Sequence, residues 1–311
     1  MFKDFDKKEW YFELMRCLEQ QNEAYARLLN SKECKTGSFA LRLLNCIKTG
    51  NWKSIRGYFR NRRWDKKIKK TAHPSPYIRR PFQAEDYFSD ERIAVYTSVF
   101  GKYDRIQEPL FKADNIDYFI VTDQEVPENS MWKKISHKTA AFDERLSNAE
   151  KSRYFKMKPE ILFGNYKYSI YVDGNIKIIS DLTPYTKLLG DTGIGFHAHS
   201  QRNCSYKELE AIKMAYKAKK EDADSYAAFL KEHRFPKDYG LLECGVIVRE
   251  HNNPICKKVM DEWWLQFMNK IKRDQVSLPF ILFNNHISVE QVAVLGQNIF
   301  ENYSFRIDRH S

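Results

Sequence analysis

From residue 93 onward, short apolar runs alternate with longer amphipathic segments. The longer segments, at 143–163, 206–233, 254–271 and 276–285, carry apolar residues at helical spacing. The short runs are typical of strands, and they read IAVYTSVFG, IDYFIVTD, WKKISH, YKYSIYV, NIKII, TGIGFHAHS and LLECGVIVRE. Because strands that alternate with helices form mostly parallel sheets with helices on their faces, the sequence predicts an α/β domain.

The composition is that of a globular protein without a membrane span. The chain has 311 residues, of which 42% are hydrophobic and 30% charged, enough for one large domain with an appendage. No window approaches the about eighteen uninterrupted apolar residues of a membrane helix, and the charged N-terminus has no signal-peptide core. The six cysteines form no C-x-x-C pair, which argues against a zinc cluster or a disulfide framework. We therefore expect a cytoplasmic protein with reduced thiols.

The positive charge is concentrated in one segment. The formal net charge is +11, and residues 51–80 alone hold eleven Lys or Arg against one acidic residue. Aromatic residues are interleaved with these cations. This fits a basic helix packed on the main domain, a peripheral contact with an anionic membrane surface, nucleic acid, or an acidic protein. The first two interpretations are favoured, and a membrane contact would lie at the inner face of the cytoplasmic membrane.

The N-terminal part differs from the rest of the chain. Residues 1–35 carry apolar residues at helical spacing and predict one or two helices, which either pack on the main domain or form a dimerising hairpin. Three prolines between residues 73 and 81 mark a linker. We therefore divide the chain into a helical, basic region with a linker at 1–85 and a main domain at 86–311.

Polar side chains follow the predicted strands at their carboxyl ends. Asp123 ends the strand YFIVTD, and Asp173 and Asn175 interrupt the apolar run YSIYVDGNIKII. Open α/β sheets bind ligands outside the carboxyl ends of their strands, so we expect these groups at one edge of the sheet. The oxygens of Asp173 and Asn175 could converge on Mg²⁺ or Mn²⁺, and Gly174 would let a diphosphate approach the backbone. The alternative is a D-G-N turn between two hairpin strands.

Three further groups of charged residues could meet an anion or a reacting sugar. Arg153 and Lys156 lie three positions apart and share one helix face. Near another strand end, Arg202 could hold a phosphate or a sugar carboxylate through its fork of donors. Asp274, in the run KRDQVS, could cap the next helix or present a carboxylate to a cleft. The alternative for each of these side chains is a solvated charge.

The sequence contains no P-loop, no G-x-G-x-x-G and no G-x-S-x-G motif, which removes the commonest nucleotide-binding and hydrolase interpretations. The run KSRYFKMKPEILFGNYKYSIYVDGNIKIISDLTPY instead resembles the D-x-D region of GT-A glycosyltransferases, where an R-x-x-K helix precedes the strand. More narrowly, residues 93–285 resemble a glycosyltransferase-like family of plant cell-wall proteins and bacterial polysaccharide loci, first described as a domain of unknown function. The matching pieces, in the family's order, are YTSVFGKYD, DYFIVTD, YVDGNIKI, HSQRNCSYKE, VIVREHN, WW and RDQVS. The resemblance implies a GT-A-like fold, with a single Rossmann-type mixed sheet flanked by helices and an N-terminal helical appendage.

The resemblance also implies a glycosyltransferase. It would move a sugar from a nucleotide-sugar donor to a saccharide or lipid-linked saccharide in the synthesis of a capsule- or O-antigen-like polysaccharide. Mn²⁺ or Mg²⁺ is the implied cofactor, with His286 as a further ligand beside Asp173 and Asn175. Asn175 stands where the motif has Asp, so the site loses one negative charge and should hold the metal more weakly.

Resemblance and residue chemistry together give three groups of candidate site residues. They are Tyr96, Thr97, Asp123, Arg153, Lys156, Asp173, Gly174 and Asn175 for the donor, His199, Arg202 and Arg273 for the acceptor or a phosphate, and Asp274, Gln275 and Glu243 for catalysis.

The course of the reaction follows from these groups. The metal, Arg153 and Lys156 would stabilise the departing nucleoside diphosphate. Inversion would need a general base, either Asp274 or Glu243, at the acceptor hydroxyl. Retention would use the D-Q pair to stabilise an oxocarbenium-like centre, and the resemblance to retaining enzymes favours it. Two other functions stay open: a non-catalytic nucleotide- or carbohydrate-binding module on the same fold, and a nucleic-acid-associated protein that uses residues 51–80.

Overall fold

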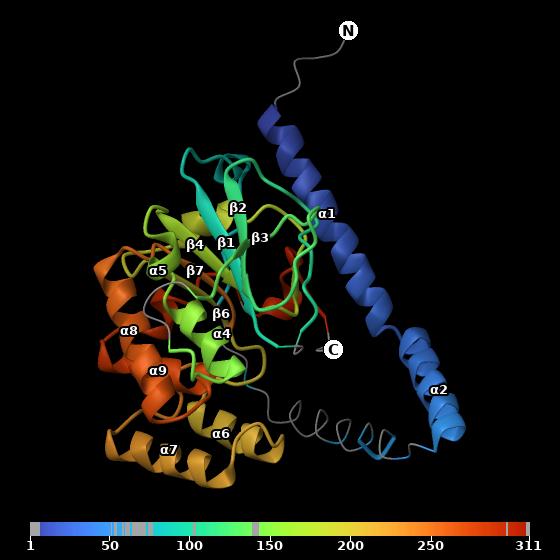
Figure 1. Ribbon diagram of the computed structural model, residues 1–311, viewed down its shortest axis with the longest axis vertical. Helices are drawn as coiled ribbons and strands as arrows, with labels where there is room; N and C mark the ends of the chain where they lie inside the picture. Colours follow the sequence, from blue (N-terminus) through green and yellow to red (C-terminus); the bar gives the residue numbers. More distant parts are fainter. Residues whose placement is uncertain are drawn as a thin grey trace.

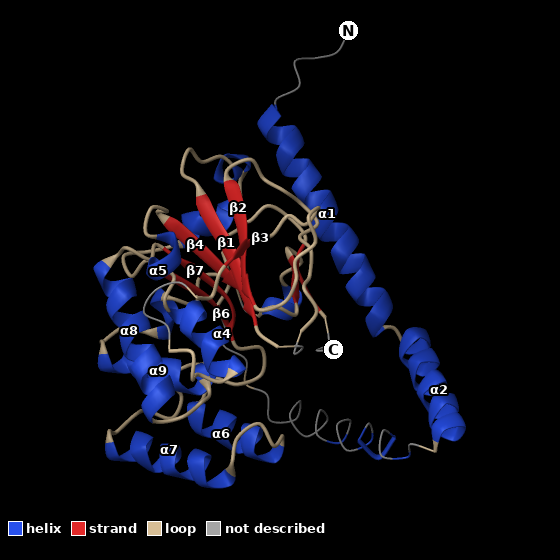
Figure 2. Ribbon diagram, in the orientation of Figure 1, coloured by secondary structure: helices blue, strands red, loops and turns tan. Residues whose placement is uncertain are grey.

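A six-stranded sheet forms the centre of the molecule (Figure 1). The structure is a computed structural model, and it describes residues 7–50, 77–101, 104–138, 143–296 and 298–308, together with residues 52, 55–57, 59, 63 and 73. The strands lie in the order β3-β2-β1-β4-β7-β6, and Figure 2 shows them in red among the helices. Their bounds are β1 Ile93–Val99, β2 Ile116–Thr122, β3 Lys133–Ile135, β4 Tyr168–Val172, β6 Ile194–Ala198 and β7 Leu242–Arg249.

The sheet is mixed because of one strand. β1 runs parallel to β2 and β4, and β2 runs parallel to β3. β7 is antiparallel to both of its neighbours, β4 and β6. The expected α/β class, with a single mixed sheet flanked by helices, is therefore confirmed. The carboxyl ends of β1, β2 and β4 lie along one edge, as the sequence predicts.

The segment around residues 173–175 is not a hairpin turn. β5 (Ile176–Ile178) leaves the main sheet and pairs antiparallel with β8 (Phe305–Ile307). The D-G-N segment therefore connects two different sheets, and the alternative interpretation as a turn between paired strands is wrong.

Helices cover one face of the sheet (Figure 1). Side chains alternate along a strand, so Tyr96 and Tyr171 belong to the core beneath these helices, whereas Val95 and Ile170 belong to a second core on the opposite face. The covering helices are α4 Asn148–Met157, α5 Glu160–Phe163, α6 Ser205–Met214, α7 Lys220–Glu232, α8 Pro254–Asn269 and α9 Asp274–Asn284. Short 3-10 turns lie at Ala84–Tyr87, Thr183–Leu188, Val289–Gln291 and Ile299–Glu301.

The helix α1 (Lys7–Asn30) packs on the second core. Its Met15 is fully buried, the hydroxyl of Tyr11 donates to Asp181 at 2.9 Å, and the amide of Asn22 donates to the carbonyl of Phe305 at 2.9 Å. These contacts join α1 to the main domain.

The helix α2 (Lys32–Thr49) continues from α1 away from the sheet (Figure 1). No helix in the described part of the chain is long and apolar enough to cross a membrane. Most of the basic segment 51–80 lies outside the described residues, so its partner stays a prediction. The boundary near residue 85 and dimerisation through the N-terminal helices also stay predictions.

Candidate active site

A buried lysine joins two carboxylates at the carboxyl end of β4. Lys156, in the last turn of α4, has a side chain only 1% exposed, and its Nζ lies 3.2 Å from Oδ1 of Asp173 and 2.9 Å from Oδ2 of Asp274. Asp173 directly follows β4, and Asp274 is the first residue of α9. A buried ammonium is stable only when its charge and its donors are satisfied, so the two carboxylates fix the position of Lys156.

Arg153 adds a second cation to this cluster. It lies one helical turn before Lys156, and its Nε is 2.7 Å from Oδ2 of Asp274. Burial alone would raise the pKa of Asp274, but Arg153, Lys156 and Arg273 outweigh burial and hold that pKa far below its usual value. Asp274 is therefore ionised throughout the neutral pH range. The R-x-x-K, D-G-N and D-Q motifs thus meet at one place, as the resemblance implies.

Arg249 and Tyr96 hold the end of α4 that carries Lys156. Arg249 of β7 is fully buried, and its guanidinium donates to the carbonyl of Lys156 at 2.6 Å and to the hydroxyl of Tyr96 at 2.5 Å. The Tyr96 hydroxyl donates in turn to the carbonyl of Phe155 at 3.0 Å. Because the ring of Tyr96 is fully buried in the core, the prediction that it lines a nucleotide pocket is wrong. Tyr96 instead fastens α4 to the sheet.

A narrow crevice lies beside Asp173 at the carboxyl ends of β1 and β4. It is too narrow to admit a water molecule, and its lining includes Thr97, Val99, Asp173 and Gly174. A Cβ atom on Gly174 would lie 2.5 Å from Cγ2 of Val99, so only glycine fits there. The Thr97 hydroxyl is buried and has no hydrogen-bond partner among the described residues. A polar ligand could satisfy this group only if the crevice widened.

Asp173 and Asn175 provide only part of a metal site. Oδ1 of Asp173 contacts the ammonium of Lys156, and the amide nitrogen of Asn175 donates to the carbonyl of Asp308 at 3.1 Å. Within the described ranges, no three His, Cys, Asp or Glu side chains gather as metal ligands. A divalent cation would fit here if it took oxygen atoms from Asp173 and Asn175 and its other ligands from phosphate and water, as Mg²⁺ often does.

His286 does not join this site. It follows the end of α9, which has 11 residues and begins at Asp274. A helix of that length is about 16 Å long, so His286 lies a full helix away from the cluster at Asp274. The implied role of His286 as a metal ligand beside Asp173 is therefore wrong. His286 is close to the D-Q motif in the sequence but not in space.

Asp123 follows β2 at the same edge of the sheet. Both of its carboxylate oxygens accept from the backbone N–H of Gly101, at 2.9 and 3.0 Å. Gly101 has a φ of 68°, a conformation that favours glycine. Asp123 therefore fixes the backbone conformation of the loop that follows β1. Its role in donor binding stays a prediction.

Glu243 and Gln275 lie where β7 begins beside α9. The carboxylate of Glu243 accepts from the backbone N–H of Ser200 at 3.0 Å, and the amide nitrogen of Gln275 donates to the carbonyl of Leu242 at 3.1 Å. Burial raises the pKa of Glu243. The hydrogen bond of Gln275 fastens the start of α9, and with it Asp274, to the sheet.

Glu208 of α6 is a buried carboxylate that is not among the predicted site residues. It forms an ion pair with Arg202, and it lies 3.9 Å from Nε2 of His199. Burial raises the pKa of Glu208 although Arg202, Arg273 and Lys217 oppose the change. Burial, together with Arg202, lowers the pKa of His199 to about 3, so this imidazole is neutral. His199, Arg202 and Arg273, which were predicted for the acceptor, thus surround the carboxylate of Glu208. In the sequence, Glu208 has the pattern of an ordinary charged residue on a helix surface.

A family model described as the TOD1/MUCI70, glycosyltransferase-like domain matches residues 80–307. A comparison with curated proteins found no match. Among solved structures, the apo structure of the bifunctional glycosyltransferase WbbM is 13% identical over 62% of this chain and 38% of that chain, with a TM-score of 0.37. The chain therefore spans about two fifths of the length of WbbM.

Two further solved structures are similar at comparable levels. Mouse xyloside xylosyltransferase 1 in its apo form is 13% identical over 71% of this chain and 95% of that chain, with a TM-score of 0.37. The galactosyltransferase LgtC in complex with donor and acceptor sugar analogues is 12% identical over 61% and 70%, with a TM-score of 0.34. The family match covers well over half of the chain, including the whole central sheet. The chain therefore belongs to the TOD1/MUCI70 family of glycosyltransferase-like domains.

Proposed function

We propose that this protein is a glycosyltransferase that moves a sugar from a nucleotide-sugar donor to a saccharide acceptor. The observation that carries the proposal is the meeting of Arg153, Lys156, Asp173 and Asp274 at the carboxyl edge of the sheet. Open α/β sheets bind ligands at this edge. The cluster offers cations for a departing diphosphate and a carboxylate for a positively charged sugar centre. Membership of a glycosyltransferase-like family supports the same function.

Arg153 and Lys156 are the groups that would stabilise the leaving diphosphate. Both are held by carboxylates before any ligand arrives, so they need little reorganisation as negative charge develops. Mn²⁺ or Mg²⁺, held by Asp173 and Asn175 together with the phosphate oxygens of the donor, would supply further positive charge there when bound.

Asp274 and Glu243 suit different tasks. The pKa of Asp274 is held far below its usual value, which makes this carboxylate a weak base but a permanent negative charge. It can therefore stabilise an oxocarbenium-like sugar, with Gln275 beside it, and this favours retention of the anomeric configuration. Inversion would instead require Glu243 as general base, because burial raises its pKa toward the neutral range.

The acceptor would be a growing cell-surface polysaccharide of the capsule or O-antigen type, free or linked to a lipid. The resemblance of the chain to proteins of bacterial polysaccharide loci supports this setting. The basic segment 51–80 would bring the enzyme to a lipid-linked acceptor at an anionic membrane surface.

The test is a thermal-shift screen of sugar nucleotides with and without Mn²⁺, followed by an assay of nucleoside diphosphate release. We expect one sugar nucleotide to raise the unfolding temperature, and we expect Asp173→Ala to abolish its turnover while the protein stays folded. Stabilisation by a sugar nucleotide without any turnover would overturn the enzymatic function in favour of a binding module. NMR of the product anomer separates retention from inversion.

A further inference from the structure

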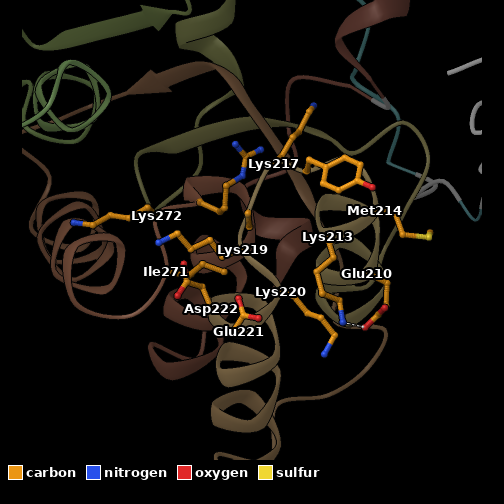
Figure 3. Close-up of a pocket in the computed structure, with 13 residues that line it drawn as sticks. Glu210, Lys213, Met214, Lys217, Lys219, Lys220, Glu221, Asp222, Ile271 and Lys272 are labelled. Carbon is orange, nitrogen blue, oxygen red and sulfur yellow. Dashed lines mark ion pairs between the residues drawn. The ribbon is translucent and has the colours of Figure 1, made fainter. Parts of the chain in front are cut away.

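An open pocket is lined by residues 210–222 and 271–273 (Figure 3). It forms where α6 ends, where α7 begins, and where residues 271–273 lead into α9. Its volume is about 880 Å³, within the range of sites for small ligands. Arg273 lines the pocket and directly precedes Asp274, so the pocket is continuous in sequence with the catalytic cluster.

The pocket carries more cations than acids. Its charged lining residues are Lys213, Lys217, Lys219, Lys220, Lys272 and Arg273 on the positive side, and Glu210, Glu221 and Asp222 on the negative side. Glu221 and Asp222 lie in the first turn of α7, where the helix dipole stabilises them without a cation. The surplus of positive charge therefore faces the pocket.

Three of the six cations are already neutralised. The ammonium of Lys213 lies 2.6 Å from both Glu210 and Asp224, and Figure 3 marks the first of these contacts. The ammonium of Lys220 lies 3.1 Å from Asp224. Lys272 is bound by Glu150, outside the pocket, at 2.7 Å. These pairs hold the walls of the pocket and leave the other three cations for a ligand.

The remaining cations are Lys217, Lys219 and Arg273. Lys217 and Lys219 are exposed and form no ion pair with any residue that the structure describes. The Nε atom of Arg273 is buried and lacks a hydrogen-bond partner in the same part of the chain. Lys217 and Arg273 also lie near Glu208, which is already paired with Arg202. An anion between Lys217 and Arg273 would therefore pair with an exposed ammonium that has no described ion pair, and it could accept from the unpartnered Nε of Arg273.

Tyr216 stands exposed at the same pocket. Its side chain is 83% exposed, and its φ of 55° lies in the left-handed region. The N–H of Lys217 donates to the carbonyl of Ile212, and the N–H of Tyr216 donates to the carbonyl of Lys213. This is the Schellman pattern, in which glycine is usual at the position of Tyr216. The chain thus places an exposed aromatic ring where glycine would be more stable, and such a ring can pack on the apolar face of a sugar.

We propose that this pocket is an acceptor subsite for a saccharide that carries an anionic group, either a phosphate or a carboxylate. Lys217, Lys219 and Arg273 bind the anion, and Tyr216 packs on the sugar ring. The proposal rests on the proposed glycosyltransferase function, because that function makes a saccharide bound in this pocket, which Arg273 lines, the acceptor.

The test measures binding without a donor, so its result does not depend on turnover. Glucose 1-phosphate, glucuronate and glucose are titrated into the full chain by calorimetry at low salt. The test variant is Lys217→Glu with Lys219→Glu. The matched control is Lys231→Glu with Lys237→Glu, which makes the same change of charge at exposed positions outside the pocket.

We expect one or both anionic sugars to bind at least tenfold more tightly than glucose. We expect the test variant to lose at least tenfold in that affinity, with the control within twofold of the wild type. Tighter binding of glucose 1-phosphate identifies phosphate, and tighter binding of glucuronate identifies carboxylate. Equal affinity for all three sugars, no binding of either anionic sugar, or unchanged affinity in the test variant overturns the subsite. Failure of every sugar nucleotide to bind would instead overturn the proposed function.

Discussion

Nζ of Lys156 lies 2.9 Å from Oδ2 of Asp274, although the two residues are 118 positions apart in the sequence. The contact joins the last turn of α4 to the first residue of α9. Asp173 shares the same ammonium, so one buried cation connects the strand end, the R-x-x-K helix and the D-Q motif. Stability and catalysis should therefore respond together when this cation is removed.

Lys156→Met removes the charge and keeps much of the volume. We expect a loss of about 3 kcal/mol in the free energy of unfolding, because the buried carboxylate of Asp274 loses one of its two contacting cations and Asp173 loses its partner. Sugar transfer should fall by about 100-fold or more, as for the loss of one preorganised electrostatic group. Urea unfolding and product assays measure the two effects. The control is Lys158→Met, whose partner Asp261 is 41% exposed, and it should cost about 1 kcal/mol or less. Wild-type stability in Lys156→Met would contradict the structural role.

Asp274 should make the fold sensitive to acid. Its pKa is lower in the folded protein than in the unfolded chain, where it is about 3.9. The ionised carboxylate therefore stabilises the fold above about pH 4, and this contribution is lost as the pH falls toward the folded value. Asp274→Asn should thus be less stable than the wild type at pH 7, and the difference should shrink as the pH falls below about 4. Urea midpoints at several pH values test this, and a constant difference would contradict it.

The sequence predicted the strand ends and their polar groups because each depends on a local pattern. An apolar run followed by Asp123 or Asp173 marks both the strand and its carboxyl end. The pairing of β5 with β8 was not predictable in this way, since it joins Ile176 to Ile307 across most of the domain. β7 likewise has no local signal that distinguishes an antiparallel strand from a parallel one.

The errors at the site have a common physical cause. Tyr96 and Thr97 are neighbours on β1, and strand alternation sends one into the core and leaves the other at the crevice. Arg249 and Glu208 are not among the predicted site residues, yet both are buried at the site, and Arg249 binds the carbonyl of Lys156, 93 positions away. His286 was assigned to the metal from its place after the D-Q motif, and the length of α9 separates the two. Burial and long-range partners are properties of the packed fold.

Gly174→Ala should destabilise the protein through a steric clash, and a second substitution at Val99 should relieve that clash. The added Cβ would lie 2.5 Å from Cγ2 of Val99, so we expect a loss of about 1–3 kcal/mol in stability together with reduced activity. In the background of Val99→Ala the same substitution should cost much less, because the clashing methyl is absent. A double-mutant cycle of unfolding free energies measures this coupling. Additive effects of the two substitutions would show that the clash is not the cause.

The substitution Glu243→Gln distinguishes sugar transfer with retention from transfer with inversion. Burial raises the pKa of Glu243 above its unfolded value of about 4.3, so its ionisation destabilises the folded protein as the pH rises past that value. We therefore expect the variant to unfold at a higher temperature than the wild type at pH 7 and at a similar one at pH 3. If transfer proceeds with retention, its rate should change by less than about tenfold. A loss of about 100-fold or more would identify Glu243 as a general base and favour inversion.

Tyr216→Gly should stabilise the protein and weaken saccharide binding at once. The φ of 55° costs a non-glycine residue roughly 1–2 kcal/mol, so glycine should raise the free energy of unfolding by up to about that amount. Loss of the ring should weaken binding of the anionic sugar by roughly threefold to tenfold, the size of an aromatic contact. Tyr216→Phe keeps the ring and the backbone strain, so it should match the wild type in both measurements. Calorimetric titration and urea unfolding of the three proteins provide the comparison. Unchanged affinity in Tyr216→Gly would mean that the exposed ring does not contact the ligand. Since this variant should be more stable than the wild type, any loss of affinity in it cannot be attributed to poor folding.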